Sequence, residues 1–316
     1  MIESYTVMHD LIIIGLGPAG VAAAIYAGRN KINTLVIGEE IGGQSVVSVN
    51  IQNWIGIPSF SGAQMAANLS EHLETVKEDV KVLKGSGVNS IVSIEEKAKT
   101  FFKVITENDE YKTITVLIAS GGRRKKLEIP GEDKFVEKGV YYCTICDAPL
   151  MVDRKVAVIG GGNAGLESVI NLLPYASQIY LMEITNKLRG DKKTQEKALH
   201  NEKIKVLLNT KALEILGNQF VTGLEYEDLT THERRKIELD GIFVEIGSAP
   251  NSGFAKDLVE INQFGEIVVD PLNGKTSLNG IWAAGDVTSL PYKQNNIAMG
   301  DAVRATLSIC DYLMKK

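Results

Sequence analysis

Two glycine-rich turns constrain the fold of this chain more than any other feature, because each stands between an apolar strand and a helix. The first turn, Gly15-Leu16-Gly17-Pro18-Ala19-Gly20, follows the apolar residues 11–14, and the second, Gly160-Gly161-Gly162-Asn163-Ala164-Gly165, follows residues 156–159. In the pattern G-x-G-x-x-G, the first glycine makes a tight turn. The second lets a pyrophosphate approach the backbone, and the third lets the helix pack against the strand. The sequence therefore predicts two β-α-β units, each built to bind a dinucleotide at a helix N-terminus.

An acidic residue at the end of the second strand of such a unit holds the adenosine ribose. In the second unit Glu183 takes this place, 23 residues after Gly160, and the motif puts this acid at about 20 residues. A carboxylate here also repels a 2′-phosphate, so we predict NADH rather than NADPH as the electron donor. In the first unit Glu39 follows Gly38 at the strand end and is the corresponding candidate.

The stretch Cys143-Thr144-Ile145-Cys146-Asp147 holds two cysteines close enough in sequence to form a local redox pair. Beside two dinucleotide-binding turns, a C-x-x-C pair indicates redox catalysis in a reducing compartment. A zinc site would need a second pair or nearby histidines, and the four histidines are scattered, so no metal is predicted. A static structural disulfide is the other alternative. The third cysteine, Cys310, lies in a helical pattern and is expected to be buried and inert.

Size and charge limit the possible functions. A chain of 316 residues allows about two domains, each with its own core. The net charge of −5, with no basic cluster larger than residues 123–126, disfavours binding to nucleic acid. The apolar run at residues 11–27 is too short for a comfortable membrane span and is broken by glycines and a proline. We therefore expect a cytoplasmic protein that binds neither nucleic acid nor membrane.

Further polar positions suit a flavin. Gly43, Gln44 and Asn53 lie in loops that offer amide donors and acceptors to the edge of a flavin ring, although such residues also simply make turns. Residues 280–283 form an apolar strand that leads to Gly285 and Asp286. An aspartate at this place can bond a ribityl or sugar hydroxyl, or it can cap the following helix.

The redox pair, the second glycine turn and Ala283-Ala284-Gly285-Asp286, in this order, resemble the low-molecular-weight thioredoxin reductases over the whole length of the chain. Residues 223–226, 241–244 and 291–294 look closer to the flavoprotein subunit of alkyl hydroperoxide reductase. Members of the thioredoxin reductase family that use NADPH carry a basic cluster where this chain has Glu183, Ile184 and Thr185, and only Arg189 remains. That flavoprotein subunit carries an N-terminal thioredoxin-like part, whereas this chain starts at the flavin strand, so we expect a separate thioredoxin- or glutaredoxin-like acceptor.

The resemblance implies an α/β fold of two Rossmann-like three-layer domains, one inserted in the other. Residues 1–120 and 248–316 are expected to form the FAD-binding domain, and residues 121–247 the nicotinamide-nucleotide domain with the redox pair. A homodimer is also implied. The resemblance matches Gln44, Asn53, Asp286 and Gln294 to positions that contact FAD. Together with the motifs, it predicts an FAD site at Gly15, Gly17, Pro18, Ala19, Gly20, Glu39, Gly43, Gln44, Asn53, Gly121, Gly285, Asp286, Gln294 and Asn295. The predicted nicotinamide site is Gly160, Gly162, Asn163, Ala164, Gly165 and Glu183.

The chemistry implied is electron transfer from NADH to FAD, then to the disulfide of Cys143 and Cys146, then to a protein disulfide. By resemblance, Cys146 faces the flavin, Cys143 attacks the partner and Asp147 is the general acid. A plain capping role for Asp147 is the alternative. Three other functions compete: the same flavoprotein reduced by ferredoxin or another carrier, a non-catalytic nucleotide sensor, and a ferredoxin–nicotinamide reductase.

Overall fold

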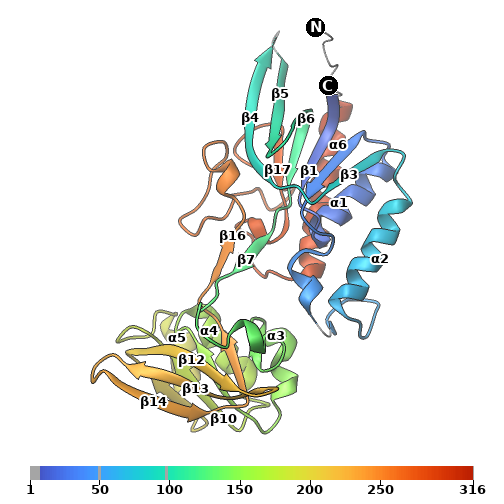
Figure 1. The fold of residues 1–316 in the computed structure, drawn as a ribbon. Coiled ribbons are helices and arrows are strands. Elements are labelled where there is room, and N and C mark those ends of the chain that lie inside the picture. Colours follow the sequence, from blue (N-terminus) through green and yellow to red (C-terminus); the bar gives the residue numbers. More distant parts are fainter. Residues whose placement is uncertain (1–7, 49–50, 97–98, 316) are drawn as a thin grey trace. The chain divides into compact units, whose positions relative to one another are not determined.

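The computed structural model describes residues 8–48, 51–96 and 99–315. The chain divides into two compact units (Figure 1). Unit 1 comprises residues 1–123 and 249–316, and unit 2 comprises residues 124–248. The chain passes between the units twice, through β7 (Gly122–Arg124) and β16 (Ser248–Pro250), which pair with each other. The boundaries that the sequence predicts, after residues 120 and 247, lie close to these two passages.

Unit 1 has a central sheet of seven strands within the described residues, in the order β3-β2-β1-β6-β5-β4, with β17 on β6. Strands β1, β2, β3, β6 and β17 pair in parallel, whereas β4 and β5 extend the sheet with antiparallel pairs. The strands are β1 (Met8–Ile14), β2 (Thr34–Gly38), β3 (Val80–Lys84), β4 (Val88–Glu96), β5 (Lys99–Thr106), β6 (Glu110–Ile118) and β17 (Ile281–Ala283).

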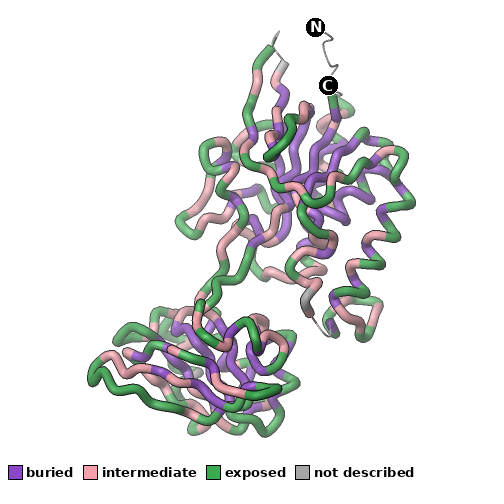
Figure 2. Tube along the Cα trace, viewed as in Figure 1, coloured by how far each residue is buried: buried purple, intermediate pink, exposed green. Residues whose placement is uncertain are grey.

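Both faces of this sheet are covered, which explains the continuous apolar run in β1. Leu11 and Ile13 point into a core shared with α1 (Pro18–Arg29), α2 (Gly62–Glu74) and α6 (Asn295–Met314), while Ile12 and Ile14 point into a second core on the other face. Figure 2 shows buried residues along the central strands, and Figure 1 shows the three helices beside the sheet. Cys310 lies in the helical core with 8% of its surface exposed, as predicted.

Unit 2 lies wholly within the described residues and has a five-stranded parallel sheet in the order β11-β10-β9-β15-β8. Its strands and helices are β8 (Val140–Tyr141), α3 (Thr144–Asp147), β9 (Lys155–Ile159), α4 (Asn163–Leu172), β10 (Gln178–Met182), α5 (Lys192–Leu199), β11 (Ile204–Leu207) and β15 (Gly241–Val244). One face packs on α4 through Leu166, Val169 and Leu172. The sheet therefore has the predicted β-α-β order around the second glycine turn.

An antiparallel sheet of β12 (Thr210–Gly217), β13 (Val221–Asp228) and β14 (Glu233–Glu238) covers the other face of the parallel sheet in unit 2. It contributes Ala212, Leu224 and Tyr226 to a core shared with Ala157 and Ile159 of β9. The three layers of unit 2 are thus helices, parallel sheet and antiparallel sheet. The antiparallel layer was not among the predicted elements.

The described residues contain no helix long and apolar enough to cross a bilayer.

Candidate functional site

The first glycine turn has the backbone that its pattern predicts. Gly15 has φ +120°, and a Cβ placed there would lie 2.2 Å from the carbonyl oxygen of Ala119. A Cβ on Gly20 would lie 1.9 Å from the carbonyl oxygen of Gly15, which shows how closely α1 packs on the end of β1. Gly17, by contrast, has no atom within 4 Å of its ideal Cβ position. The space beside Gly17, at the start of α1, fits the pyrophosphate of a dinucleotide.

The second turn repeats this geometry. Gly160 has φ +124°, and a Cβ there would lie 2.3 Å from the carbonyl oxygen of Glu245. A Cβ on Gly165 would lie 1.7 Å from the carbonyl oxygen of Gly160, while Gly162 has open space on its Cβ side. Asn163 and Ala164 open α4 and are exposed, as residues facing a ligand must be. Unit 2 therefore also offers a cradle for a pyrophosphate.

Two segments of unit 1 that are distant in sequence lie against the first glycine turn. A Cβ on Gly43, at the start of η1 (Gly43–Val47), would lie 3.2 Å from the Cα of Gly17. A Cβ on Gly285, the first residue of η5 (Gly285–Val287), would lie 3.1 Å from the Cβ of Ala19. The fold therefore brings three of the predicted flavin segments to one place. Asp286 follows in η5, and Gln294 occupies the N-cap position of α6.

Amide side chains join the loop after η1 to the start of α6. The Nδ2 of Asn53 donates to the Oε1 of Gln294 at 2.9 Å, which pairs two predicted residues. The Nδ2 of Asn296 donates to the carbonyl oxygen of Asn53 at 2.7 Å, and the hydroxyl of Ser45 donates to the Oδ1 of Asn295 at 3.0 Å. Ser45 and Asn296 were not predicted. The sequence gives only one indication of them, which is that each is a polar residue next to a predicted one.

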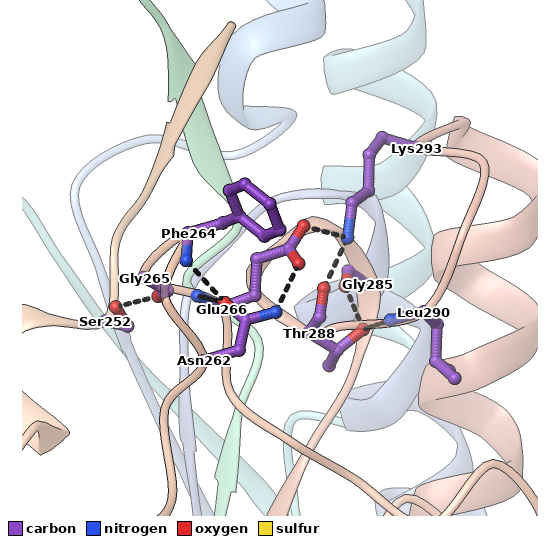
Figure 3. Close-up of polar contacts among 9 residues, drawn as sticks. All are labelled: Ser252, Asn262, Phe264, Gly265, Glu266, Gly285, Thr288, Leu290 and Lys293. Carbon is purple, nitrogen blue, oxygen red and sulfur yellow. Dashed lines mark hydrogen bonds and ion pairs between the residues drawn. The ribbon is translucent and has the colours of Figure 1, made fainter. Parts of the chain in front are cut away.

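The loop between Asp286 and Gln294 is anchored by an ion pair that sequence reasoning missed (Figure 3). The Nζ of Lys293 lies 3.1 Å from the Oε1 of Glu266 and also donates to the carbonyl oxygen of Thr288. The Nδ2 of Asn262 donates to the other carboxylate oxygen of Glu266 at 2.9 Å. These contacts hold the segment between Asp286 and Gln294, two residues predicted to meet the flavin, against the loop that carries Glu266.

Three other predicted flavin residues lie outside these contacts. Glu39 comes directly after β2 and is exposed, and its carbonyl oxygen accepts a hydrogen bond from the N–H of Gly85 at 3.1 Å. Gly121 has φ +63° and follows β6, and its carbonyl oxygen accepts from the N–H of Asn251 at 2.9 Å. Gln44 lies in η1 and is exposed. The assignment of these three to the flavin site stays a prediction, as does that of the other residues named for it.

Glu183 lies where the ribose acid of unit 2 was predicted, directly after β10, with 2% of its surface exposed. Its Oε2 accepts from the N–H of Gly161 at 2.7 Å, and its Oε1 accepts from the N–H and hydroxyl of Thr185, both at 3.0 Å. Burial alone would raise the pKa of Glu183, but these hydrogen bonds and the charge of Arg189 outweigh it and hold the pKa below its usual value. The carboxylate is therefore ionised and fixed beside the glycine turn.

Cys143 and Cys146 form a disulfide, with their Cα atoms 5.3 Å apart. Cys143 is the N-cap of α3 and is half-buried, while Cys146 is exposed. The N–H groups of Cys146 and Asp147 both donate to the carbonyl oxygen of Cys143, at 3.1 and 3.0 Å. The pair therefore lies on one turn of helix in the same unit as the second glycine turn.

Asp147 is a buried acid beside this pair, with 8% of its surface exposed. Burial, together with the negative charge of Glu137, raises its pKa to about 7, and the charge of Arg124 opposes the shift. Its side chain makes no capping hydrogen bond at the start of η3 (Ala148–Met151). A carboxyl group with this pKa can both give and take a proton near neutral pH, which the alternative role as a helix cap would not require.

Fold and site together define a class of protein: a disulfide oxidoreductase with two dinucleotide-binding units. The family profile of the pyridine nucleotide-disulphide oxidoreductases matches residues 9–302, and the chain belongs to this family. This confirms the predicted fold class of two Rossmann-like domains and the predicted class of enzyme. The match also agrees with the predicted resemblance to thioredoxin reductases.

Individual relatives point the same way. The chain is 39% identical over 315 residues to the F subunit of alkyl hydroperoxide reductase from Xanthomonas campestris pv. phaseoli, covering 97% of this chain and 57% of that protein. It thus spans less than two thirds of that relative. Thioredoxin reductase from Streptococcus pyogenes MGAS5005 shares 31% identity and a TM-score of 0.90, over 98% of this chain and 100% of that one. A ferredoxin-flavin thioredoxin reductase from Clostridium acetobutylicum shares 27% identity and a TM-score of 0.52, over 98% and 99% of the two chains.

The middle glycines of the two turns allow a paired test. We expect Gly17→Ala to fold, because nothing lies within 4 Å of the added Cβ, and to weaken FAD binding at least about tenfold by filling the pyrophosphate space. Gly162→Ala should keep FAD and lose nicotinamide affinity by a similar factor. Both constants are measurable by titration with the respective nucleotide.

Gly253→Ala is the matched control, because Gly253 also has open space at its Cβ position but lies outside both turns. It should bind both nucleotides as the parent does. If Gly17→Ala bound FAD normally and Gly162→Ala lost it instead, the assignment of FAD to unit 1 would be wrong.

Proposed function

We propose that the chain is an FAD-dependent disulfide reductase that takes electrons from NADH. It passes them through Cys143 and Cys146 to the disulfide of a thioredoxin- or glutaredoxin-like protein. The observation that carries this proposal is the C-x-x-C disulfide with a buried acid of pKa about 7 beside it, in the same unit as a dinucleotide turn. Bound FAD would supply the redox chemistry that links the nicotinamide, which gives up a hydride, to a disulfide, which takes up an electron pair.

The residues of unit 1 suit the flavin nucleotide. The space at Gly17 and the N–H groups at the start of α1 would take the pyrophosphate. Gly43 and Gly285 lie against this turn, and Asp286 offers a carboxylate for a ribityl or sugar hydroxyl. Asn53 and Gln294, already paired with each other, present amides beside the start of α6.

The redox pair would reduce a partner by thiol–disulfide exchange once it is in the dithiol form. The thiolate of Cys143 attacks one sulfur of the partner disulfide, forming a mixed disulfide and releasing the other partner sulfur as a thiolate that takes a proton. Cys146 then attacks Cys143, which restores the Cys143–Cys146 disulfide and releases the second partner thiol. Asp147 is the group proposed to exchange the protons that these thiols lose and gain.

Glu183 favours NADH over NADPH in this proposal, because its ionised carboxylate would accept the ribose hydroxyls and repel a 2′-phosphate. We expect NADH to bleach the bound flavin at least about tenfold faster than NADPH at equal concentration under anaerobic conditions. Stopped-flow absorbance of the flavin measures both rates. Reduced ferredoxin is the third arm of the same experiment.

Reduction by ferredoxin is the second candidate function, favoured by the similarity to the Clostridium acetobutylicum enzyme and by the lack of the basic cluster after β10. If only reduced ferredoxin bleached the flavin, ferredoxin would take the place of NADH as the proposed electron donor, and the rest of the proposal would stand. A nucleotide sensor would bind a nucleotide without reducing any disulfide, and family membership argues against it. The homodimer, the cytoplasmic location and the identity of the acceptor remain predictions.

A further inference from the structure

Thr144 lies between the two cysteines, and its hydroxyl has a partner that no motif indicates. The Oγ1 of Thr144 donates to the Oε1 of Glu245 at 2.9 Å, and the hydroxyl of Ser168 donates to the same oxygen at 2.8 Å. The hydroxyls of Thr144 and Ser168 also contact each other. Thr144 and Ser168 are each 4% exposed, so both hydroxyls are shielded from water, whereas Glu245 is half-buried.

The three residues come from three elements of unit 2. Thr144 opens α3, Ser168 lies on α4, the helix that starts at the second glycine turn, and Glu245 directly follows β15. The backbone of Glu245 also supports that turn. Its N–H donates to the carbonyl oxygen of Ile159 at 2.8 Å, and its carbonyl oxygen is the atom that a Cβ on Gly160 would strike. One residue thus touches both the nucleotide turn and the redox loop.

Of the two residues between the cysteines, Ile145 is exposed and Thr144 is buried. Helix α3 is only four residues long, too short to hold itself in place by its own hydrogen bonds. The position of Cys143 and Cys146 therefore depends on contacts such as that of Thr144 with Glu245. The pKa of Glu245 is raised, mainly by burial and also by the negative charge of Glu167, while the two hydroxyl donors and the charge of Arg124 oppose the shift.

We propose that Glu245 is a positioning residue, which through Thr144 holds the redox loop so that the two thiols of Cys143 and Cys146 stay in reach of each other. The inference deepens the proposed function, on which its role in turnover rests. Closing a disulfide from a dithiol is favoured when the two sulfurs are already near each other, because less freedom is then lost. Loss of the contact between Glu245 and Thr144 would increase the conformational freedom of the dithiol form, whereas in the oxidised form the disulfide bond itself still restrains the loop.

The test is the thiol–disulfide equilibrium of the purified flavin-loaded protein with dithiothreitol. In this exchange two electrons and two protons pass from the reagent to the Cys143–Cys146 disulfide, and the reagent becomes its cyclic disulfide. We expect Glu245→Ala to shift the equilibrium toward the protein dithiol by about tenfold. Thr144→Val, which breaks the same contact from the other side, should give a shift in the same direction. Alkylation of the free thiols and mass spectrometry measure the fraction reduced.

Two further variants separate a hydrogen-bonded anchor from other roles. Glu245→Gln keeps an oxygen that accepts from both hydroxyls, so it should restore the parental equilibrium although the charge is gone. Glu196→Ala removes an acidic side chain from the exposed side of α5, away from Glu245, and is the matched control, with no shift expected. A parental equilibrium in both Glu245→Ala and Thr144→Val would overturn the proposal. So would a Glu245→Gln protein that behaves like Glu245→Ala.

This experiment needs neither NADH nor a protein acceptor. If the parent protein failed to reduce protein disulfides with NADH, the proposed function would be refuted. The dithiothreitol equilibrium would still test whether Glu245 anchors the redox loop. Conversely, normal turnover with an unchanged equilibrium in all variants would refute only the anchor. In an active protein, Glu245→Ala should lower kcat for the acceptor and leave its KM unchanged, because the anchor acts on the thiols and not on the acceptor's binding surface.

Discussion

Cys146→Ser is expected to abolish the reduction of protein disulfides while leaving the flavin bound and reducible by NADH. In the proposed route, the electron pair must enter the Cys143–Cys146 disulfide before any partner is reduced, and a single thiol cannot form that disulfide. The FAD site proposed for unit 1 and the glycine turn with Glu183 contain neither cysteine, so both nucleotide sites should survive. Turnover with a disulfide acceptor should fall by more than about 1000-fold. Coupled absorbance assays measure it, with anaerobic bleaching for the first half-reaction.

The same variant also tests the order of the two sulfurs. Cys143 remains able to attack an acceptor disulfide, and without Cys146 the mixed disulfide cannot be resolved. Mass spectrometry should therefore find the acceptor trapped on Cys146→Ser and not on Cys143→Ser. Cys310→Ser is the matched control: its thiol is buried in the helical core of unit 1 and should be dispensable for turnover. Normal turnover in Cys146→Ser would exclude the proposed route.

Local sequence patterns were sufficient for the parts of the site in which neighbouring residues act together. The run at residues 11–14 contributes alternate side chains to two cores, and that double burial is what its continuous apolar character indicates. In each turn the third glycine packs on the carbonyl oxygen of the first, five residues earlier, so the spacing alone carried this part of the prediction. The first glycine instead meets a distant residue, Ala119 or Glu245, which the spacing did not show. Glu183 was predictable because a single strand and helix separate it from Gly160.

The contacts that the sequence did not reveal join residues far apart in the chain. Asn53 and Gln294 are 241 residues apart, and Thr144 and Glu245 are 101 apart, so no periodicity links them. The ion pair of Glu266 with Lys293 likewise joins two separate loops. The strand β14 has a largely charged sequence, Glu-Arg-Arg-Lys-Ile-Glu, which resembles a solvated loop. Its place in a sheet follows from pairing with β13 and not from its own pattern.

Asp147→Asn is expected to make the protein more stable at pH 8 and much less active. The folded state raises the pKa of Asp147 from 3.8 to about 7, so the fold favours the neutral carboxyl group. The contribution of Asp147 to stability is therefore full below pH 3.8 and is lost as the pH rises to about 7, above which the buried carboxylate is a fixed cost. Asparagine does not titrate, so the variant should gain stability over the parent between these pH values. The gain should level off at a few kcal/mol above about pH 7, as measured by chemical denaturation of the flavin-loaded protein.

The activity of this variant should change in the opposite direction, because the amide cannot donate a proton to a leaving thiolate. We expect turnover with a disulfide acceptor to fall by about 100-fold. In the parent, the neutral carboxyl group is lost as the pH rises through about 7, so the rate should decline there, and this limb of the pH profile should be absent in Asp147→Asn. Glu137→Gln removes a negative charge that raises the pKa of Asp147, so it should keep the limb and move it to lower pH. An Asp147→Asn protein that retains the limb would show that this carboxyl group is not the proton donor. A variant less stable than the parent at pH 8 would show that it is not a destabilising buried charge at that pH.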